Sequence, residues 1–133
     1  MNARMFALVF GVVYLLVGLL GFTASATMAD ANLLGLFPVN LMHNIVHIAI
    51  GVWGLLSYRS LTGAVTYARG LAIVYALLTI LGIIPATNRL FGLAPLYGND
   101  IWLHALTAAI AAYFGWMAPA ETVDTMDASR RRA

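Results

Sequence analysis

All three histidines of the chain lie in two polar stretches of an otherwise apolar sequence. The first stretch contains His43 and His47, and the second contains Asp100 and His104. Residues four apart share one face of a helix, so each stretch presents a pair of polar side chains on one face. Imidazoles and carboxylates bind metal ions and carry protons, and polar side chains are costly in hydrocarbon. These four residues are therefore the candidate site.

The composition predicts that this site belongs to a membrane protein. The chain has 133 residues, 62% of them hydrophobic and 9% charged, with a mean hydropathy of +0.90. Soluble domains carry about 25% charged residues, so we expect one integral membrane domain. The sequence has no cysteine and no lysine, which excludes disulfides, thiolate chemistry and Schiff-base chemistry. It has no nucleic-acid-binding signature.

Four apolar segments are each near the length of about 20 residues that a helix needs to cross a bilayer. They cover approximately residues 5–22, 39–58, 64–84 and 96–118. The first segment also resembles a secretory signal, with Arg4 before it and Ala24-Ser25-Ala26 after it. Its apolar run is long for a signal core, so we expect a retained helix. The predicted fold is an all-α, integral membrane four-helix bundle over residues 1–118, followed by a polar cytoplasmic tail over residues 119–133.

Arginine placement predicts the orientation of the bundle. With a cytoplasmic N-terminus, six of the seven arginines lie on the cytoplasmic side and Arg89 alone lies outside. Because cytoplasmic loops carry the excess of positive charge, we expect a multi-pass protein of the bacterial inner membrane with both termini cytoplasmic. Residues 33–38 of the first outer loop are apolar but too few to span. We expect them to lie on the membrane surface or to fold over the mouth of the bundle.

The chain resembles two quasi-repeated transmembrane hairpins. One constant offset relates Pro38, His43 and His47 to Pro95, Asp100 and His104. Tyr14 and Tyr75 hold similar heights on the first helix of each hairpin. Below the polar pairs, small residues continue the same two helix faces: Gly51, Gly54, Ala108, Ala111 and Gly115. Small residues allow close helix packing, so we expect the second and fourth helices to pack stripe to stripe and to bring the polar pairs together.

The polar motifs are similar to those of a known family. Gly35-Leu36-Phe37-Pro38-Val39-Asn40, His43-Asn44 and His47, followed by Asn99-Asp100 and His104, resemble the signature of a small four-helix bacterial membrane-protein family. That family is catalogued as a domain of unknown function, the 4383 family. The resemblance extends from the first helix to about Gly115. It implies a four-helix fold and no particular activity.

Several roles for the polar cluster stay open. It is either a hydrogen-bond network that fixes helix register, or a site for a divalent metal such as Zn²⁺, Mn²⁺, Fe²⁺ or Cu²⁺. His47 and His104 are also candidate axial ligands to haem or another pigment. A proton relay needs a polar path, and this path ends where the faces become Gly and Ala. The surrounding partners that we expect are Asn40, Asn44, Asn99, Tyr14 and Tyr75.

The sequence therefore predicts a non-enzymatic membrane protein. Its size and its small-residue helix faces favour a structural or accessory subunit of a larger membrane complex, with lipid and other subunits or further copies as partners. No nucleophile is paired with a base, so we expect no hydrolytic activity. We expect no resident cofactor by default. The alternative is a metal-binding or haem-binding membrane protein that uses the four residues of the cluster.

Overall fold

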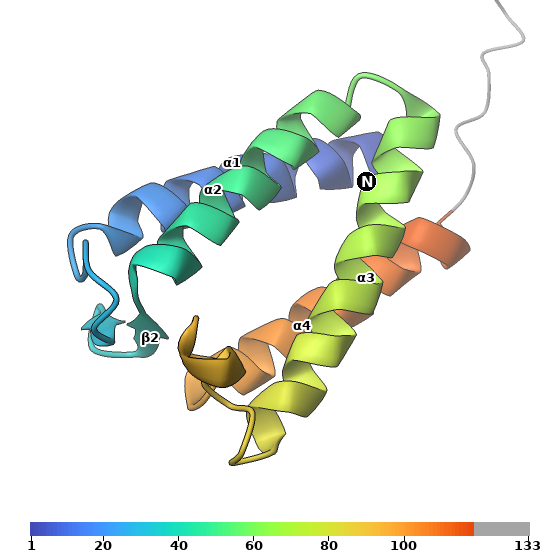
Figure 1. Ribbon diagram of the computed structural model, residues 1–133. Coiled ribbons are helices and arrows are strands. Elements are labelled where there is room, and N and C mark those ends of the chain that lie inside the picture. Colours follow the sequence, from blue (N-terminus) through green and yellow to red (C-terminus); the bar gives the residue numbers. More distant parts are fainter. Residues whose placement is uncertain (119–133) are drawn as a thin grey trace, which may run out of the picture.

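The computed structural model describes residues 1–118, which fold mostly into helices (Figure 1). The four helices are α1 (Ala3–Gly21), α2 (Leu41–Ser57), α3 (Leu61–Ile83) and α4 (Asn99–Ala112). The short π-helix η2 (Tyr113–Met117) continues α4. The prediction of four helices is confirmed. The predicted tail over residues 119–133 lies outside the described residues.

Side-chain caps fix where three of the helices begin. Asn2 accepts a hydrogen bond from the backbone N–H of Met5, and Asn40 accepts one from that of His43. Ser60 does the same at the start of α3. Such caps satisfy backbone donors that have no partner inside the helix. α4 instead follows Gly98, whose φ of 68° suits a residue without a side chain. The cap at Asn40 holds the first turn that carries His43.

Glycines set the close packing of α1 against α2. A Cβ atom added to Gly51 would lie 2.6 Å from the backbone N of Leu15, and one added to Gly54 would lie 2.8 Å from the Cα of Gly11. The two backbones are therefore nearly in contact, and the glycine face of α2 is turned toward α1. The expected stripe-to-stripe packing of α2 on α4 was wrong. Glycines on both helices of the pair allow a closer approach than the pairing of α2 with α4 would give.

The stripe on α4 packs in the other helix pair. Figure 1 shows α3 beside α4, and Gly115 lies against the backbone of Arg69 on α3. Ala111 is fully buried in the core, and Ala108 packs against that core. The aromatic part of this core includes Phe6 and Phe114, whose stacked rings have centroids 5.0 Å apart. α1 thus meets the second helix pair at the end of the bundle near the N-terminus.

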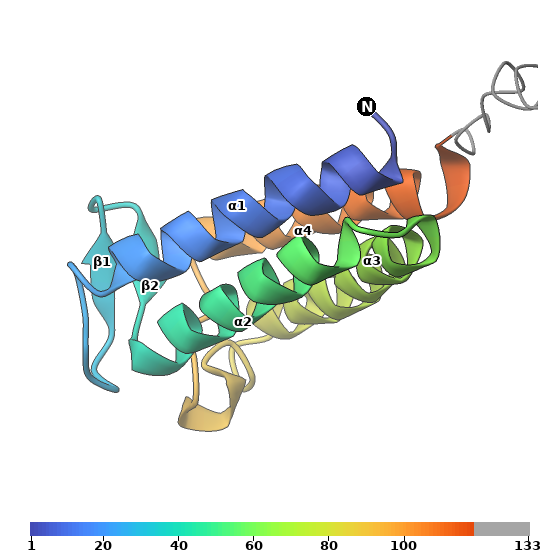
Figure 2. The ribbon, with the colours of Figure 1, turned by 90° about the horizontal axis from the view of Figure 1, so that it is seen from above.

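Two long loops lie together at the opposite end of the bundle (Figure 2). The first carries a two-stranded antiparallel ribbon, β1 (Ala31–Leu33) with β2 (Phe37–Val39). The sequence analysis did not predict these strands. Their turn places Leu34 and Gly35 at positive φ, 54° and 71°. The second loop contains the short 3₁₀ helix η1 (Leu90–Gly92) and leads into α4. Both loops are therefore placed to cover the first turns of α2 and α4.

Two of the helices, α1 and α3, are long and apolar enough to cross a membrane. α2 is also apolar but has 17 residues. Arginines close the end of the bundle that holds the N-terminus. Arg4 donates from Nε to the carbonyl of Tyr58 at 2.9 Å, and Arg69 donates from Nε to the carbonyl of Gly115 at 2.8 Å. Cationic side chains interact favourably with the free carbonyl groups at the C-terminal ends of helices.

Candidate binding site between the helix pairs

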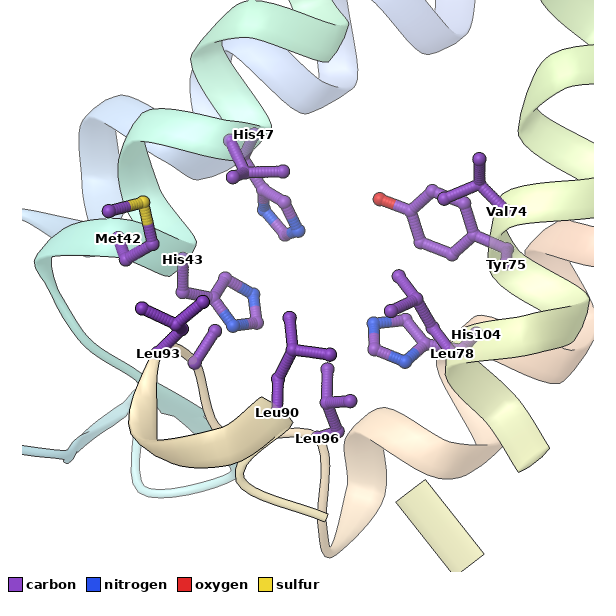
Figure 3. Close-up of a pocket in the computed structure, with 12 residues that line it drawn as sticks. Met42, His43, His47, Val74, Tyr75, Leu78, Leu90, Leu93, Leu96 and His104 are labelled. Atoms are coloured by element: carbon purple, nitrogen blue, oxygen red, sulfur yellow. The ribbon is translucent and has the colours of Figure 1, made fainter. Parts of the chain in front are cut away.

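A cavity of about 320 Å³ lies between α2, α3, α4 and the loop that carries η1. Figure 3 shows that side chains from all of these segments surround one space. We call it the histidine cavity. Its polar lining side chains are His43, His47, Tyr75 and His104, and the other lining residues are Met42, Val46, Val74, Leu78, Leu90, Leu93, Ala94 and Leu96. All three histidines of the chain thus face one small and otherwise apolar space.

Three of the four candidate residues line this cavity, and the fourth, Asp100, lies beside His43. The ring centroids of His43 and His47 lie 4.3 Å apart on α2, as expected for residues one helical turn apart. Nδ1 of His43 lies 3.8 Å from Oδ2 of Asp100, the second residue of α4. His104 follows Asp100 by one turn and lines the same cavity. The first turns of α2 and α4 therefore meet through a histidine and a carboxylate.

Two tyrosines pack against His47 and His104, the second histidine on α2 and the histidine on α4. The ring of Tyr14 on α1 meets the ring of His47 edge-on, with centroids 5.1 Å apart. The ring of Tyr75 on α3 meets that of His104 edge-on at the same 5.1 Å. The two tyrosine rings lie 5.6 Å from each other. Each helix pair therefore contributes one tyrosine–histidine contact to a shared layer of rings.

A second cavity of about 210 Å³ lies on the other side of this layer, between α1 and α4. We call it the rear cavity, and His47, Tyr75 and His104 line both cavities. Thr107 also lines the rear cavity, and its hydroxyl accepts a hydrogen bond of 3.4 Å from Tyr14. The sequence analysis missed Thr107, which lies three residues after His104 and so on a neighbouring face of α4. The two helix pairs are thus separated by space on both sides of the ring layer.

Several polar atoms at this layer are buried without a hydrogen-bond partner among the described residues. They are Nδ1 of His47, Nδ1 of His104 and Oδ2 of Asp100, in residues that are 7%, 3% and 1% exposed. A buried polar atom without a partner costs about 1–3 kcal/mol. The two histidines therefore border the cavities, while their Nδ1 atoms lie buried without a partner among the described residues.

Comparison with known proteins identifies a family but no activity. Residues 4–117 match the family described as Domain of unknown function (DUF4383). The chain belongs to the DUF4383 family. No curated protein and no solved structure matches the chain. The family expected from the polar motifs is therefore confirmed, and the function of this DUF4383 protein has to be argued from its site.

The three asparagines expected around the cluster have other roles in the DUF4383 chain. Asn40 caps α2 and donates from Nδ2 to the carbonyl of Leu93 at 3.1 Å. Asn44 donates to the carbonyl of Ser25 at 2.8 Å. Asn99 donates to the carbonyl of Leu36 at 3.1 Å. All three join the two long loops to the helices, so they position the histidine cavity without lining it.

The two long loops of the DUF4383 chain are joined by a charged contact that the sequence analysis missed. Nη1 of Arg89 lies 2.6 Å from Oδ2 of Asp30, and the Tyr97 hydroxyl donates to the same oxygen at 3.0 Å. Partial burial and the hydrogen bond to Asp30 raise the pKa of Tyr97 above its ordinary value of 10.0. The available signal was one acid and one base, each isolated in an apolar loop. We call these three residues the loop clasp.

The described part of the DUF4383 chain gives no support to the metal hypothesis. Within residues 1–118, no three His, Asp or Glu side chains are grouped so that they could share a metal ion. Within the same range, no hydrogen bond joins a serine or threonine hydroxyl to a histidine. The hydroxyl of Ser25 donates instead to the carbonyls of Thr27 and Ala29. In this part of the chain the histidines line a cavity and belong to no such metal-binding group.

Proposed function

We propose that this protein is an integral protein of the bacterial inner membrane, and that all four helices cross the bilayer. Its helices expose many large apolar side chains and bury several polar ones. Leu16, Leu77 and Leu106 are 53%, 56% and 58% exposed, whereas Tyr75 and His104 are 2% and 3% exposed. Large exposed apolar surfaces mark contact with lipid or partners. The apolar composition and the lengths of α1 and α3 support the same proposal.

The proposed orientation has both termini in the cytoplasm. The end of the bundle with the N-terminus carries Arg4, which bonds the carbonyl of Tyr58 next to Arg59, and Arg69, which bonds that of Gly115. The loop at the opposite end carries Arg89. Cytoplasmic segments carry the excess of arginine and lysine. We also propose that the bundle is built from two quasi-repeated hairpins, α1 with α2 and α3 with α4. The equal distances of the Tyr14–His47 and Tyr75–His104 contacts support this relationship.

Within that membrane fold, the proposed function is non-enzymatic binding of a small lipophilic molecule in the histidine cavity. One observation carries this proposal: His47 and His104, whose Nδ1 atoms have no hydrogen-bond partner among the described residues, line a cavity whose other walls are almost entirely apolar. Ligand sites in proteins have this form, with mainly apolar walls and a few placed polar groups. A hydrogen-bond network alone would use these nitrogen atoms within the protein.

A second candidate role is that of an accessory subunit in a larger membrane assembly or in a self-associated form. The tips of both outer loops favour it. Leu34 and Phe91 are 81% and 80% exposed, and both have positive φ, 54° and 57°. A residue other than glycine is strained in this region of backbone conformation, and such strain concentrates at functional positions. Binding a ligand and serving as a subunit are compatible roles.

Extraction of the purified protein tests the binding function. The full chain is purified in mild detergent, and its bound small molecules are measured by solvent extraction and mass spectrometry, with elemental analysis for metals. We expect one organic compound in stoichiometric amount, lost in the double variant His47→Ala/His104→Ala. Leu77→Ala is the matched control, because Leu77 is on α3 but outside the cavity lining. A stoichiometric metal without an organic compound, or equal extracts from all variants, would refute the binding proposal.

A further inference from the structure

We propose that the histidine cavity binds the ring of a quinone, and that the apolar chain of the quinone leaves between α2 and α3 into the lipid. This inference rests on the proposed function, and it specifies the class of ligand. Three observations carry it: the shape of the cavity, the absence of charge in its lining, and the placement of its hydrogen-bonding groups on two opposed sides.

The cavity has buried histidine and tyrosine rings at its inner end and apolar side chains at its mouth. Val46 on α2 and Val74 on α3 both line it, and they are 42% and 45% exposed on the surface of the bundle. His47 and Tyr75, each one residue further along, are 7% and 2% exposed. The space therefore runs from the buried rings to the outer surface of the helices. In the proposed membrane orientation this surface faces lipid, so a molecule enters sideways with its polar part first.

The lack of charged side chains in the described lining of the cavity favours a neutral molecule. Among the described residues, no Arg, Lys, Asp or Glu lines the histidine cavity, and Asp100 lies beside it, 3.8 Å from Nδ1 of His43. Phosphate and carboxylate groups are recognised in proteins mostly by arginine or lysine. Arg89, in the loop beside η1, is already paired with Asp30 in the loop clasp. A phospholipid headgroup or a fatty acid would therefore enter without a cationic partner, whereas a neutral ring would not need one.

The hydrogen-bonding groups match two oxygens at opposite ends of a ring. Figure 3 shows His43 and His47 on one side of the space, and Tyr75 and His104 on the other. Imidazole N–H and phenol O–H groups donate to carbonyl oxygens. A quinone carries two carbonyl acceptors across a flat ring and an apolar chain, so it uses donors on both sides and also the apolar mouth. A lipid alcohol has one oxygen and would use one side.

Binding measurements on the full chain test this inference. The protein is reconstituted in phosphatidylcholine nanodiscs free of quinone, and decylubiquinone retained above that in empty nanodiscs is quantified by chromatography. We expect saturable binding of one quinone per chain. Affinity should fall about tenfold or more in His47→Ala/His104→Ala, as for the loss of one or two hydrogen bonds.

A second variant leaves the histidines unchanged. Val46→Trp fills the mouth from an exposed position, and it should reduce quinone binding to a similar extent without unfolding the bundle. Leu77→Ala is the control and should bind as the native chain does. Farnesol, with one hydroxyl and an apolar chain, should compete about tenfold more weakly or worse.

The outcomes separate this inference from the broader function. Equal competition by farnesol, or quinone binding unchanged in both cavity variants, would overturn the quinone assignment. If decylubiquinone does not bind but a different organic compound is extracted in stoichiometric amount, the ligand class is wrong and the binding function stands. If neither measurement finds an organic ligand, both proposals are refuted.

Discussion

The rings of Tyr14 and Tyr75 lie 5.6 Å apart at the centre of the bundle, and each also meets one histidine edge-on. The two tyrosines belong to different helix pairs. Elsewhere α1 and α2 approach through glycines, so their contact is tight, whereas the two pairs meet at this level through rings flanked by cavities. The aromatic rings span the distance between the two helix pairs and leave space on either side of themselves. The histidine cavity is therefore a consequence of how the pairs are joined.

The hydroxyl of Tyr14 gives the first prediction. It donates to Thr107 at 3.4 Å and so connects α1 to α4. We expect Tyr14→Phe to lower the free energy of unfolding by about 0.6 kcal/mol, the mean for hydrogen bonds between membrane helices. Unfolding in mixed micelles measures the change. Tyr113→Phe is the control, because Tyr113 is 46% exposed and should have no effect. An equal change in both variants would contradict the assigned bond.

The second prediction concerns the contact of α1 with α2. Gly51→Ala would place a methyl group 2.6 Å from the backbone N of Leu15, which cannot move without moving its helix. We expect a loss of about 1–3 kcal/mol in stability, the cost of overpacking. Ala49→Leu is the comparison, because it adds bulk on an exposed face of the same helix and should be tolerated. Thermal unfolding of both variants measures the difference. Equal stability of Gly51→Ala and Ala49→Leu would contradict the close contact of Gly51 with α1.

The sequence predicted the members of the site better than the way in which helices bring them together. His43 and His47 are one turn apart on any helix, and their match with Asp100 and His104 was enough to predict the cluster. The partner of the glycine stripe was not predictable in the same way. Gly51 and Gly54 fit closely against any helix that offers small residues, and both α1 and α4 do so. The choice depends on the whole bundle.

The loops were the least predictable part of the fold. Residues 31–39 are apolar and contain a glycine and a proline, so they lack the alternation that indicates a half-buried strand. Their pairing as β1 and β2 depends on the positive φ of Leu34, which is rare for leucine. The clasp between Asp30 and Arg89 joins residues 59 apart in the chain. Such contacts follow from the tertiary fold and not from a local pattern.

The third prediction separates the two partners of the loop clasp. Arg89 is 63% exposed, so its ion pair with Asp30 should contribute at most about 1 kcal/mol. Asp30 is 17% exposed and also accepts hydrogen bonds from Tyr97 and Asn40. Asp30→Asn should therefore destabilise the fold more than Arg89→Gln. A double-mutant cycle at low and high salt measures the coupling. The coupling energy between Asp30 and Arg89 should decrease as the salt concentration rises. A coupling energy that does not change with salt would argue against the ion pair.

The fourth prediction is a pH dependence at the clasp. The pKa of Tyr97 is raised above 10.0 in the fold, so the folded state holds the phenol proton more tightly than the unfolded state. Its contribution to stability is therefore complete below pH 10 and declines as the pH rises through the raised value. Unfolding of the native chain and of Tyr97→Phe between pH 8 and 11, about the range in which the phenol begins to ionise, measures it. The stability difference between the two should narrow in the alkaline part of the range; a constant difference would contradict the assignment.

The last prediction concerns orientation in the membrane. A reporter fused after Ala133 should be active on the cytoplasmic side, and one inserted after Gly35, at the turn of the β-ribbon, should be active outside. The reason is the distribution of arginines, since cytoplasmic segments hold the excess of positive charge. Adding two arginines at the Gly35 turn should reduce the fraction of molecules in which this turn lies outside, because orientation responds to positive charge in short loops. Adding two glutamates there is the control and should have little effect. Periplasmic activity of the fusion after Ala133 would reverse the proposed topology and place the histidine cavity nearer the cytoplasmic face.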